Sequence, residues 1–591
     1  MEGWNKIKYR GKIKNEASAW SAVFISVFPD FHDASRAASE FNKWIWDMTT
    51  TQVSSTQSTA SNYRCELTLA SVLASGIEAG GSQEIITHGG LRLTYHDLNE
   101  RVCKLGYALR QLGAKDETRV AVLERDTHRY LESYFAVPML GATLMTVNIR
   151  LSVDQIRYTL QHSQSELIIA AAEFMPLLEQ VFADSDNVPP IVVIGQSDSS
   201  LPCVGEYEDL LSAADSAFEF PDVNEDSVAT HFYTTGTTGL PKGVTYTHRQ
   251  LVTHTLAVGF ALGTADDYQA FRRSDVYMPL TPMFHVHAWG LPYVATLLGV
   301  KQVYPGKYDA PSLVELVLAE GVTFSHCVPT ILQLLLVEAE NKSQKLPGWK
   351  VMVGGSAMSS TLAKRAMASG LHPFTGYGMS ETCPVVSFAR TSASEAAAHP
   401  EKLCRVGHPM PLTTLKIERK DGSGQGGQGE LVARSVWLTQ QYHNDPAMSE
   451  QLWQGGFLHT GDVAVKDADG AFRIVDRTKD VIKSGGEWLS SLELEDCISE
   501  HPNVEEVAVI AIANEKWGER PCAFIKPKQH PEQPESMIDE IHGLLREHIK
   551  QGKLPTYAIP DEIRFADELP RTSVGKLNKK LLRQNRQTNG E

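Results

Sequence analysis

The chain has 591 residues, of which 42% are hydrophobic and 21% are charged, and its formal net charge is −16. This length is well beyond the ~250–300 residues at which a single hydrophobic core stops growing, so at least two domains are expected. The acidic charge, without a dense block of Lys and Arg, argues against binding to nucleic acid through its phosphate backbone.

The first 60 residues read as an extension and not as part of a folded domain. The apolar run at 20–28 follows a basic stretch and imitates a signal peptide, but it has no small-residue cleavage site. A tract rich in Ser, Thr and Gln follows Met48. We interpret residues 1–60 as a disordered or non-essential extension; if translation begins near Met48, residues 1–47 carry no function.

Eight cysteines are scattered along the chain without a CxxC pair, which is the pattern of neither a disulfide framework nor a zinc site. Unpaired cysteines are typical of a reducing compartment, so we expect a cytoplasmic protein. The sequence has no apolar run near the ~20 residues that a membrane-spanning helix needs, and we expect no transmembrane segment.

From about residue 65, strand-like and helix-like segments alternate along the chain. Residues 130–142 predict a helix that ends at a glycine, and short apolar, β-branched runs predict buried strands at 118–124, 166–172 and 189–195. The same alternation continues at 322–339 and 349–355. It is typical of an α/β architecture with largely parallel sheets.

The composition changes twice in the second half of the chain. A Gly/Gln-rich turn at 419–430 is expected to join short strands, and charges and glycines interrupt a β-rich stretch at 475–488. The remainder reads as a small α/β domain, with strands at 504–513 and 522–528 and a helix near 536–551. We predict a large domain at 61–478, a hinge at 478–480, a small domain at 479–585 and a polar tail at 586–591.

Residues 234–243, TTGTTGLPKG, predict a phosphate-binding loop that is not a Walker A loop, because Lys242 lies between a proline and a glycine. Glycines let the backbone approach an anion, hydroxyls donate to phosphate oxygens, and Lys242 adds a cation. The alternative, a polar hairpin between two strands, does not need this density of donors. The predicted phosphate contacts are Thr234, Thr235, Gly236, Thr237, Thr238, Gly239 and Lys242.

This loop resembles that of the AMP-forming acyl-CoA synthetases, whose loop reads [ST]-[ST]-G-[ST]-T-G-x-P-K-G. Other motifs of the family follow in the family's order, and the resemblance spans roughly residues 65–585. It implies an α/β fold: a large N-terminal domain of parallel-rich sheets with helices and a β-barrel-like subdomain, followed by a small mobile α+β C-terminal domain.

The segment FTGYGMSETCP at 374–384 resembles the family's second motif. The resemblance assigns Tyr377 to adenine, Ser380 to the α-phosphate and Glu381 to Mg²⁺, with Gly376 and Gly378 allowing close approach. Thr238 of the loop is a second metal-site candidate. Thr is usual before the glutamate, and Ser380 keeps its hydroxyl group. A hard carboxylate beside phosphates suits Mg²⁺.

Three further motifs lie towards the C-terminus. In HTGDVAV, at 459–465, Asp462 matches the residue that binds the ribose hydroxyls. In the segment at 475–495, Arg477 matches a second ribose contact, Lys479 the hinge, and Lys483 with Gly485, Gly486 and Glu487 the face that turns inward for thioester formation. In LPRTSVGKLNKK, at 569–580, Lys576 matches the adenylation lysine.

The acid and the acceptor are less clearly indicated. His285 matches an acyl-site histidine, Trp289 is either an aromatic gate or a core residue, and Gly354, Gly355 and Ser356 leave room for an apolar chain. The His-x-His pair at 285–287 has no third ligand, which argues against zinc. No aspartate lies near position 285 to hold an amino-acid ammonium group. Trp517, in a segment that resembles the CoA-binding region, is either a CoA contact or a packing residue.

The resemblance therefore implies a fatty acid–CoA ligase that uses ATP, Mg²⁺ and CoA, with medium-chain acids favoured and a homodimer as the common default. The alternatives are a ligase for methylthiopropionate, an acyl-AMP ligase that loads a carrier protein, a luciferase-like monooxygenase, and a non-enzymatic regulator. The last predicts damaged motifs, whereas Thr238, Lys242, Glu381, Asp462, Arg477 and Lys576 are all present.

Overall fold

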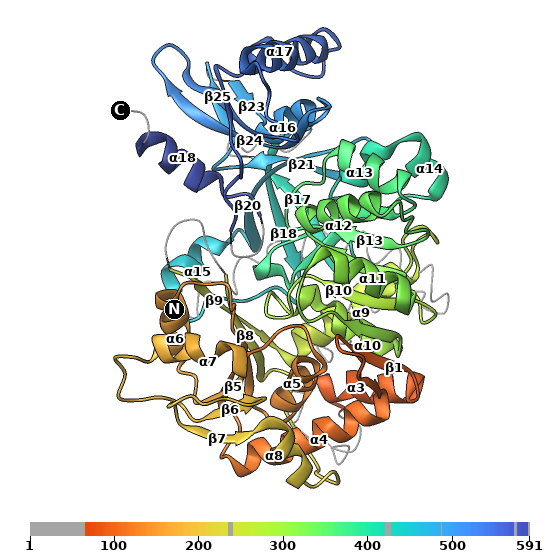
Figure 1. Cartoon of the computed structure of the whole chain (residues 1–591), viewed down its shortest axis with the longest axis vertical. Helices are drawn as coiled ribbons and strands as arrows, with labels where there is room; N and C mark the ends of the chain where they lie inside the picture. The colour runs from red at the N-terminus through yellow and green to blue at the C-terminus, as the bar shows by residue number, and fades with distance from the viewer. Residues whose placement is uncertain (1–64, 235–239, 420–426, 486, 573–575, 589–591) are drawn as a thin grey trace, which may run out of the picture. The chain divides into compact units, whose positions relative to one another are not determined.

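The computed structural model describes residues 65–234, 240–419, 427–485, 487–572 and 576–588. The predicted extension at 1–60, phosphate-loop residues 235–239, most of the Gly/Gln-rich turn at 419–430, and Gly486 lie outside the described residues. The described residues form four β-sheets (Figure 1).

The first sheet is parallel except at one edge, and its strand order is β7-β6-β5-β3-β4-β8-β9. Only the β8–β9 pair is antiparallel. Strand β5 is buried along its whole length, as expected for a strand covered on both faces. The strands are β3 (Arg119–Leu123), β4 (Thr143–Thr146), β5 (Leu167–Ala171), β6 (Ile191–Ile194), β7 (Cys203–Glu206), β8 (Val228–Thr234) and β9 (Lys242–Thr247).

The second sheet has the order β16-β15-β14-β13-β12-β10-β11-β1-β2. Its pairs from β14 through to β1 are parallel, and its two edges are antiparallel. The strands are β1 (Glu84–Thr87), β2 (Arg92–Thr94), β10 (Val276–Leu280), β11 (Lys301–Tyr304), β12 (Phe324–Cys327), β13 (Lys350–Val353), β14 (His372–Gly378), β15 (Val385–Phe388) and β16 (His408–Pro409).

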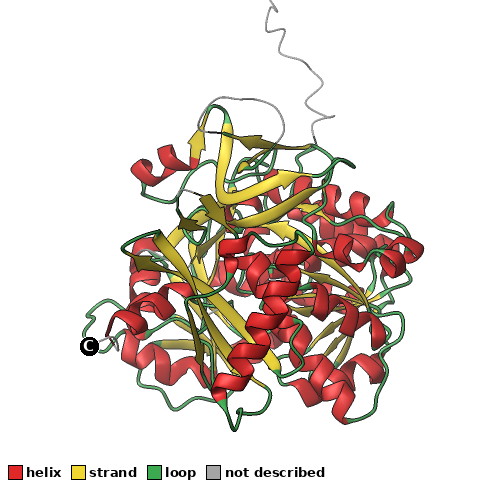
Figure 2. Ribbon diagram, turned by 90° about the horizontal axis from the view of Figure 1, so that it is seen from above, coloured by secondary structure: helices red, strands yellow, loops and turns green. Residues whose placement is uncertain are grey.

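Helices flank these two sheets (Figure 2). Local signals fix their ends: α12 starts at Pro329, whose fixed φ suits the first helical turn, and α11 is followed by Gly321 at φ +66°. The helices that precede the C-terminal segment are α3 (Leu69–Gly80), α4 (Tyr95–Gln111), α5 (His128–Met139), α6 (Val153–Ser163), α7 (Met175–Val181), α8 (Tyr207–Ala213), α9 (His248–Gly263), α10 (Leu291–Leu298), α11 (Ala310–Glu320), α12 (Pro329–Asn341), α13 (Ser360–Ala368), α14 (Ala393–Ala398) and α15 (Pro446–Leu452).

Short 3₁₀ helices complete this part of the chain. They are η2 (Ala172–Phe174), η3 (Ala288–Gly290), η4 (Ser380–Thr382) and η5 (Pro400–Cys404). The strands predicted at 118–124, 166–172 and 189–195 and the helix predicted at 130–142 are confirmed as β3, β5, β6 and α5, and the alternation expected to continue at 349–355 does so as β13. Residues 322–339 form β12 followed by most of α12.

The third sheet is antiparallel and corresponds to the region where a barrel-like subdomain is expected. Among the described residues it pairs as an open sheet, β17-β18-β20, with β19 and β21 both on β20. Its strands are β17 (Thr413–Glu418), β18 (Gly429–Ser435), β19 (Trp453–Gln454), β20 (Phe457–Lys466) and β21 (Phe472–Arg477).

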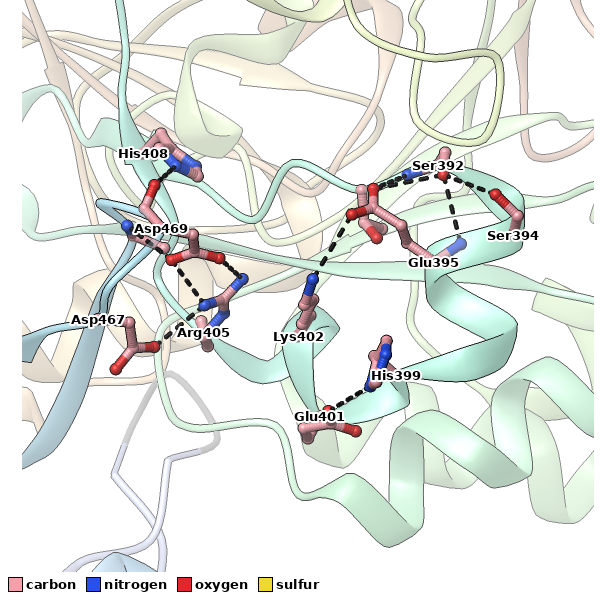
Figure 3. Close-up of polar contacts among 12 residues, drawn as sticks. Ser392, Ser394, Glu395, His399, Glu401, Lys402, Arg405, His408, Asp467 and Asp469 are labelled. Atoms are coloured by element: carbon pink, nitrogen blue, oxygen red, sulfur yellow. Dashed lines mark hydrogen bonds and ion pairs between the residues drawn. The ribbon is translucent and has the colours of Figure 1, made fainter.

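Ion pairs and backbone hydrogen bonds join the β20–β21 turn to the segment that precedes β16 (Figure 3). Arg405 forms ion pairs of 3.0 Å with Asp467 and 2.9 Å with Asp469. Beside it, Gly407 and Phe472 exchange backbone hydrogen bonds of 3.0 and 2.8 Å. Strand β21, which leads to Arg477, is therefore held firmly next to the second sheet.

The fourth sheet and four helices form the C-terminal segment. The sheet order is β23-β22-β25-β24, with β26 parallel to β25. The strands are β22 (Ile482–Ser484), β23 (Glu487–Leu489), β24 (Val504–Asn514), β25 (Gly518–Pro527) and β26 (Glu562–Phe565), and the helices are α16 (Ser491–Ser499), α17 (Pro534–Lys550), η6 (Thr556–Ala558) and α18 (Lys579–Thr588).

The hydrophobic cores change at the predicted hinge. The largest cluster contains buried residues from Leu69 to Phe472, and two others contain residues from Ile482 to Leu582. The predicted domain boundary at 478/479 falls between these ranges, although a small fourth cluster of Val463, Val475 and Val481 spans it. The polar tail expected at 586–591 begins inside α18, because Arg586 forms a 2.6 Å ion pair with Glu562 on β26.

No helix in the described part of the chain is long and apolar enough to span a bilayer.

Candidate active site

A cavity of about 520 Å³ lies where the second and third sheets meet the C-terminal segment. Most predicted nucleotide-site residues that the structure describes line it. These are Thr234, Lys242, Gly376, Tyr377, Gly378, Ser380, Glu381 and Arg477, joined by the predicted hinge residue Lys479, the predicted adenylation lysine Lys576, and His285, Trp289 and Gly355 of the predicted acyl pocket. Asp462, Gly354 and Ser356 are not among the lining residues. Residues far apart in sequence therefore converge on one site.

The β8–β9 hairpin carries both ends of the predicted phosphate loop. Thr234 pairs with Lys242 across the hairpin, and the residues between them that were predicted to bind phosphate, 235–239, lie outside the described residues. The Lys242 ammonium lies 4.7 Å from the centre of the Tyr442 ring. Partial burial lowers the pKa of Lys242, and its cation faces the cavity.

The segment at 374–384 needs glycine because the backbone folds tightly on itself. A Cβ at Gly378 would overlap the Pro384 carbonyl, and a Cβ at Gly376 would lie 2.7 Å from the sulfur of Met352. The turn that follows is fixed by Tyr246, whose hydroxyl donates to the Ser380 carbonyl at 2.7 Å. These contacts place Ser380 and Glu381 at the cavity wall.

Glu381 is 7% exposed and is held by a residue that sequence reasoning missed. The Tyr442 hydroxyl donates to its Oε1 at 2.7 Å, and Oε2 has no hydrogen-bond partner among the described residues. A buried carboxylate that lines the cavity and has one oxygen without a protein partner among the described residues suits a hard cation such as Mg²⁺. The described residues contain no group of three or more His, Cys, Asp or Glu that forms a complete metal site.

Tyr377, Asp462 and Arg477 form one hydrogen-bonded group. The Tyr377 hydroxyl donates to Asp462 Oδ2 at 2.8 Å, and Arg477 Nε donates to Oδ1 at 3.2 Å. The antiparallel pairing of β20 with β21 puts Asp462 opposite Arg477. Burial raises the pKa of Asp462, and Arg477 opposes this rise.

Lys576 is partly buried and reaches the cavity from the C-terminal segment. A Cβ on Gly355 would lie 3.1 Å from Lys576 Cε, so the lysine stem passes directly over this glycine. Among the described residues, no carboxylate is within ion-pair distance of its ammonium. Burial, then the nearby Arg477, lowers the pKa of Lys576, while Asp462 and Glu381 raise it. The site therefore holds a cation with capacity to bind an anion.

Three residues of the predicted acyl pocket, His285, Trp289 and Gly355, line the same cavity as Lys576. Trp289 is 5% exposed, lies 5.0 Å from the His326 ring and also lines the cavity. A Cβ on Gly354 would lie 3.0 Å from the Trp289 ring, so glycine is required there. Trp289 is thus both a core residue and a wall of the site, whereas Ser356 is exposed.

His285 separates the main cavity from a second one of about 30 Å³, whose lining includes Leu280, Val328 and Ile331. Burial, then Lys576, lowers the pKa of His285 to about 3, so its ring is neutral near pH 7. His287 is also buried, between the rings of Tyr134 and Phe232.

The residues expected to serve thioester formation lie outside the lining of the cavity. Lys483, Gly485, Glu487 and Trp517 are exposed together on the C-terminal segment. Gly485 has φ +63° and donates its N–H to the Trp517 carbonyl at 2.7 Å, and a Cβ on it would lie 3.1 Å from the Trp517 ring. Lys576, and not Lys483, therefore faces the cavity in this structure.

Sequence reasoning missed several lining residues, notably Tyr442, Glu430 and His459. Tyr442 reaches the site because the chain at 442–443 pairs with β9, with a backbone hydrogen bond of 2.8 Å from His443 to Gly243. Its segment has no glycine pattern and no phosphate-binding motif, so no sequence signal indicated it.

Comparison with known proteins agrees with this arrangement. Residues 77–443 match the family described as AMP-binding enzyme, and residues 493–576 match the AMP-binding enzyme C-terminal domain. The chain is 40% identical over 535 residues to a long-chain-fatty-acid–CoA ligase of Thermus thermophilus, covering 88% of this chain and 95% of that protein.

Two other relatives are similar over comparable lengths. A medium-chain-fatty-acid–CoA ligase of Ectopseudomonas oleovorans is 32% identical, covering 88% of this chain and 96% of its own. A 3-methylmercaptopropionyl-CoA ligase of Ruegeria pomeroyi is 35% identical, covering 85% and 93%. Among solved structures, the anthranilate CoA ligase AuaEII in complex with anthranoyl-AMP has the same fold, with a TM-score of 0.78 at 23% identity, covering 89% of this chain and 98% of that one.

Proposed function

The chain belongs to the AMP-binding enzyme family, and from this premise we propose that it is an ATP-dependent fatty acid–CoA ligase. The observation that carries the proposal is the convergence of Lys242, Glu381 and Lys576 on one cavity beside the Tyr377–Asp462–Arg477 group. This set provides cations for phosphates and hydrogen-bonding groups for a nucleoside.

In the first half-reaction, a carboxylate oxygen forms a bond to the α-phosphorus of ATP, and the bond to pyrophosphate breaks. Both reactants are anionic, so their approach needs positive charge. Lys242 and Lys576 supply it at the cavity and act by positioning and electrostatic stabilisation. Asp462 accepts from the ribose hydroxyls, and Tyr377 packs against adenine.

We assign Mg²⁺ to Glu381 Oε2, with Thr238 as a second contact. When bound, this ion would neutralise charge on the phosphates of ATP. Tyr442 orients the Glu381 carboxylate by holding Oε1.

In the second half-reaction, the sulfur of CoA bonds to the acyl carbonyl carbon, its proton goes to solvent, and AMP leaves. We propose that residues 479–585 rotate about Lys479 so that Lys483, Gly485, Gly486 and Glu487 replace Lys576 at the cavity, with CoA passing Trp517. Such motions need only a few residues that absorb dihedral change. The exposure of Lys483 and Trp517 supports two separate arrangements.

We place the acid in the pocket formed by His285, Trp289, Gly354, Gly355 and Ser356, and we favour medium chains. A ligase for 3-methylthiopropionate is the second candidate, because two relatives named 3-methylmercaptopropionyl-CoA ligase are 35% and 33% identical. The proposal includes a cytoplasmic location, which eight free cysteines support, and a homodimer.

CoA-dependent AMP release measured over a series of acids tests this assignment. The series runs from acetate to palmitate and includes 3-methylthiopropionate and benzoate. We expect the specificity constant to peak at medium length. A peak at acetate or benzoate would contradict the proposed pocket, and pyrophosphate release without CoA consumption would favour a carrier-protein acceptor.

A further inference from the structure

Two aspartates cross the junction between residues 66–478 and 479–585, and each lies at the N-terminus of a helix on the other side. The first meets α16. Its N-cap, Ser490, accepts the Glu493 N–H at 3.0 Å, and the next N–H, of Ser491, donates to Asp476 Oδ2 at 2.6 Å. Asp476 belongs to β21, before the predicted hinge.

The second aspartate repeats this geometry in the opposite direction. The N-cap of α13, Ser359, accepts the Leu362 N–H at 3.2 Å, and the N–H of Ser360 donates to Asp496 Oδ1 at 3.0 Å. Asp496 lies on α16 itself. The N-terminus of helix α16 thus binds Asp476 of the larger part of the chain, and Asp496 of α16 in turn binds the N-terminus of α13. It lies beside α13 and β21 (Figure 1).

Helix N-termini carry unsatisfied N–H groups and the positive end of the helix dipole, so a carboxylate there is stabilising. Asp476 is 1% exposed, and Asp496 is half-buried. Burial raises the pKa of both carboxyls; the rise is opposed at Asp476 by Lys579 and then by the hydrogen bonds from Ser491, and at Asp496 by the hydrogen bond from Ser360. A buried carboxylate without these partners is costly, so both contacts favour the present orientation over others.

Both contacts involve residues that are close in sequence to residues lining the cavity. Helix α13 directly follows the loop that contains Gly355, against which the Lys576 stem packs. Lys576 and Asp496 therefore contact the two ends of one short segment, 355–360. Asp476 immediately precedes Arg477, which holds Asp462.

We propose that Asp476 and Asp496 are positioning residues that hold residues 479–585 in the orientation that places Lys576 in the cavity. Both bonds join parts of the chain that must separate if the segment rotates for thioester formation. Breaking them shifts the population from the adenylating arrangement towards the thioester-forming one. This inference rests on the proposed function, because it assigns the two contacts to one of its two half-reactions.

The test compares the half-reactions in Asp496→Ala, Asp476→Ala and Asp496→Asn. Acyl-AMP formation is measured as single-turnover pyrophosphate release without CoA, and thioester formation as CoA consumption from supplied acyl-AMP. We expect each alanine variant to slow adenylation roughly five- to tenfold, as for loss of a helix cap. We expect thioester formation to stay unchanged or to rise, and the asparagine variant, whose amide oxygen still accepts, to lie between.

Glu500→Gln is the matched control, because Glu500 lies just beyond α16 and pairs with His548 of the same segment at 3.1 Å. Both of its half-reactions should match those of the unmodified protein. Equal losses in both half-reactions of the alanine variants, or no change in either, would overturn the inference. A failure of the unmodified protein to form acyl-AMP from any acid would instead overturn the proposed function.

Discussion

Lys576 illustrates how a residue's role depends on its surroundings. A lysine beside a glycine near the end of a chain is ordinarily solvated, yet here it is partly buried in a cavity without a carboxylate in ion-pair range among the described residues. Removing a cation from water without a partner is costly. Its retention is explained if an anionic substrate completes the site.

Lys576→Ala should therefore abolish acyl-AMP formation and spare thioester formation. Removing one preorganised electrostatic contact of this kind lowers the rate by about 10²–10³, or ~3–4 kcal/mol. Pyrophosphate release without CoA measures the first half-reaction, and CoA consumption from supplied acyl-AMP measures the second. Equal losses in both would contradict an exchange of Lys576 for the Lys483 face.

Tyr442 provides a second test at single-residue scale. Tyr442→Phe removes the hydroxyl that holds Glu381 Oε1 but keeps the ring beneath Lys242. A hydrogen bond to a charged group contributes about 1.5 kcal/mol or more, so adenylation should slow at least roughly tenfold. Because Glu381 would be less well oriented, the Mg²⁺ concentration needed for half-maximal rate should rise. A slower rate with an unchanged Mg²⁺ requirement would argue against Glu381 as the metal ligand.

At the scale of elements, the end of β14 is more constrained than a strand end usually is. The Gly378→Ala methyl would overlap the Pro384 carbonyl, so the backbone must move, at a cost of about 1–3 kcal/mol in unfolding free energy. Gly543 is an exposed residue in the middle of α17, and the methyl group of Gly543→Ala would meet nothing within 4 Å. Because alanine has the higher helix propensity, this variant should raise the free energy of unfolding by about 0.5–1 kcal/mol. Thermal unfolding measures both variants, and opposite shifts in melting temperature are expected.

The sequence predicted the elements whose burial pattern is local. Apolar, β-branched runs such as 166–172 read as buried strands because a strand covered on both faces needs no polar alternation. Likewise, Asp462 and Arg477 were recognised by their motifs, and pairing of neighbouring strands brings them together.

Contacts set by tertiary structure could not be predicted in this way. Tyr442 reaches Glu381 only because its segment lies beside β9. The start of the predicted polar tail belongs to α18, where Arg586 forms an ion pair with Glu562 on β26. The open pairing of the third sheet is also a long-range property. In each case the deciding interaction joins residues distant in sequence.

At the scale of the whole molecule, buried histidines dominate the acid side of the stability profile. Burial lowers the pKa of six histidines to about 3 or 4, from an ordinary value of 6.5. They are His128, His248, His254, His285, His287 and His326. Such a group is neutral in the folded state and binds a proton more readily when unfolded. Its contribution to stability is present above pH 6.5 and is lost as the pH falls towards 3–4.

Seven carboxyls among the described residues act in the opposite direction, because burial raises their pKa: Glu124, Asp126, Glu132, Asp462, Asp476, Glu495 and Asp496. Burial raises the pKa of Glu124 and of Asp126 to about 7. Each contributes stability that is complete below its unfolded pKa near 4 and is lost as the pH rises through 7. The pKa is also lowered, first by burial, at His231, His372, His443 and His542, so between pH 7 and 5 ten histidines outnumber the seven carboxyls among the described residues. At about 2 kcal/mol per histidine at pH 5, their loss exceeds the gain.

We therefore expect the melting temperature to fall as the pH is lowered from 7 to 5. Two variants should change the slope of melting temperature against pH in opposite directions. His287→Phe removes one of the six groups, in an aromatic environment that suits phenylalanine, and should make the fall shallower. Asp126→Asn imitates the protonated carboxyl and should stabilise the protein at pH 8 but not at pH 5, so the fall becomes steeper. Thermal unfolding followed by circular dichroism from pH 5 to 8 measures all three proteins. A profile that rises towards pH 5, or slopes that move together in the two variants, would show that other groups control acid stability.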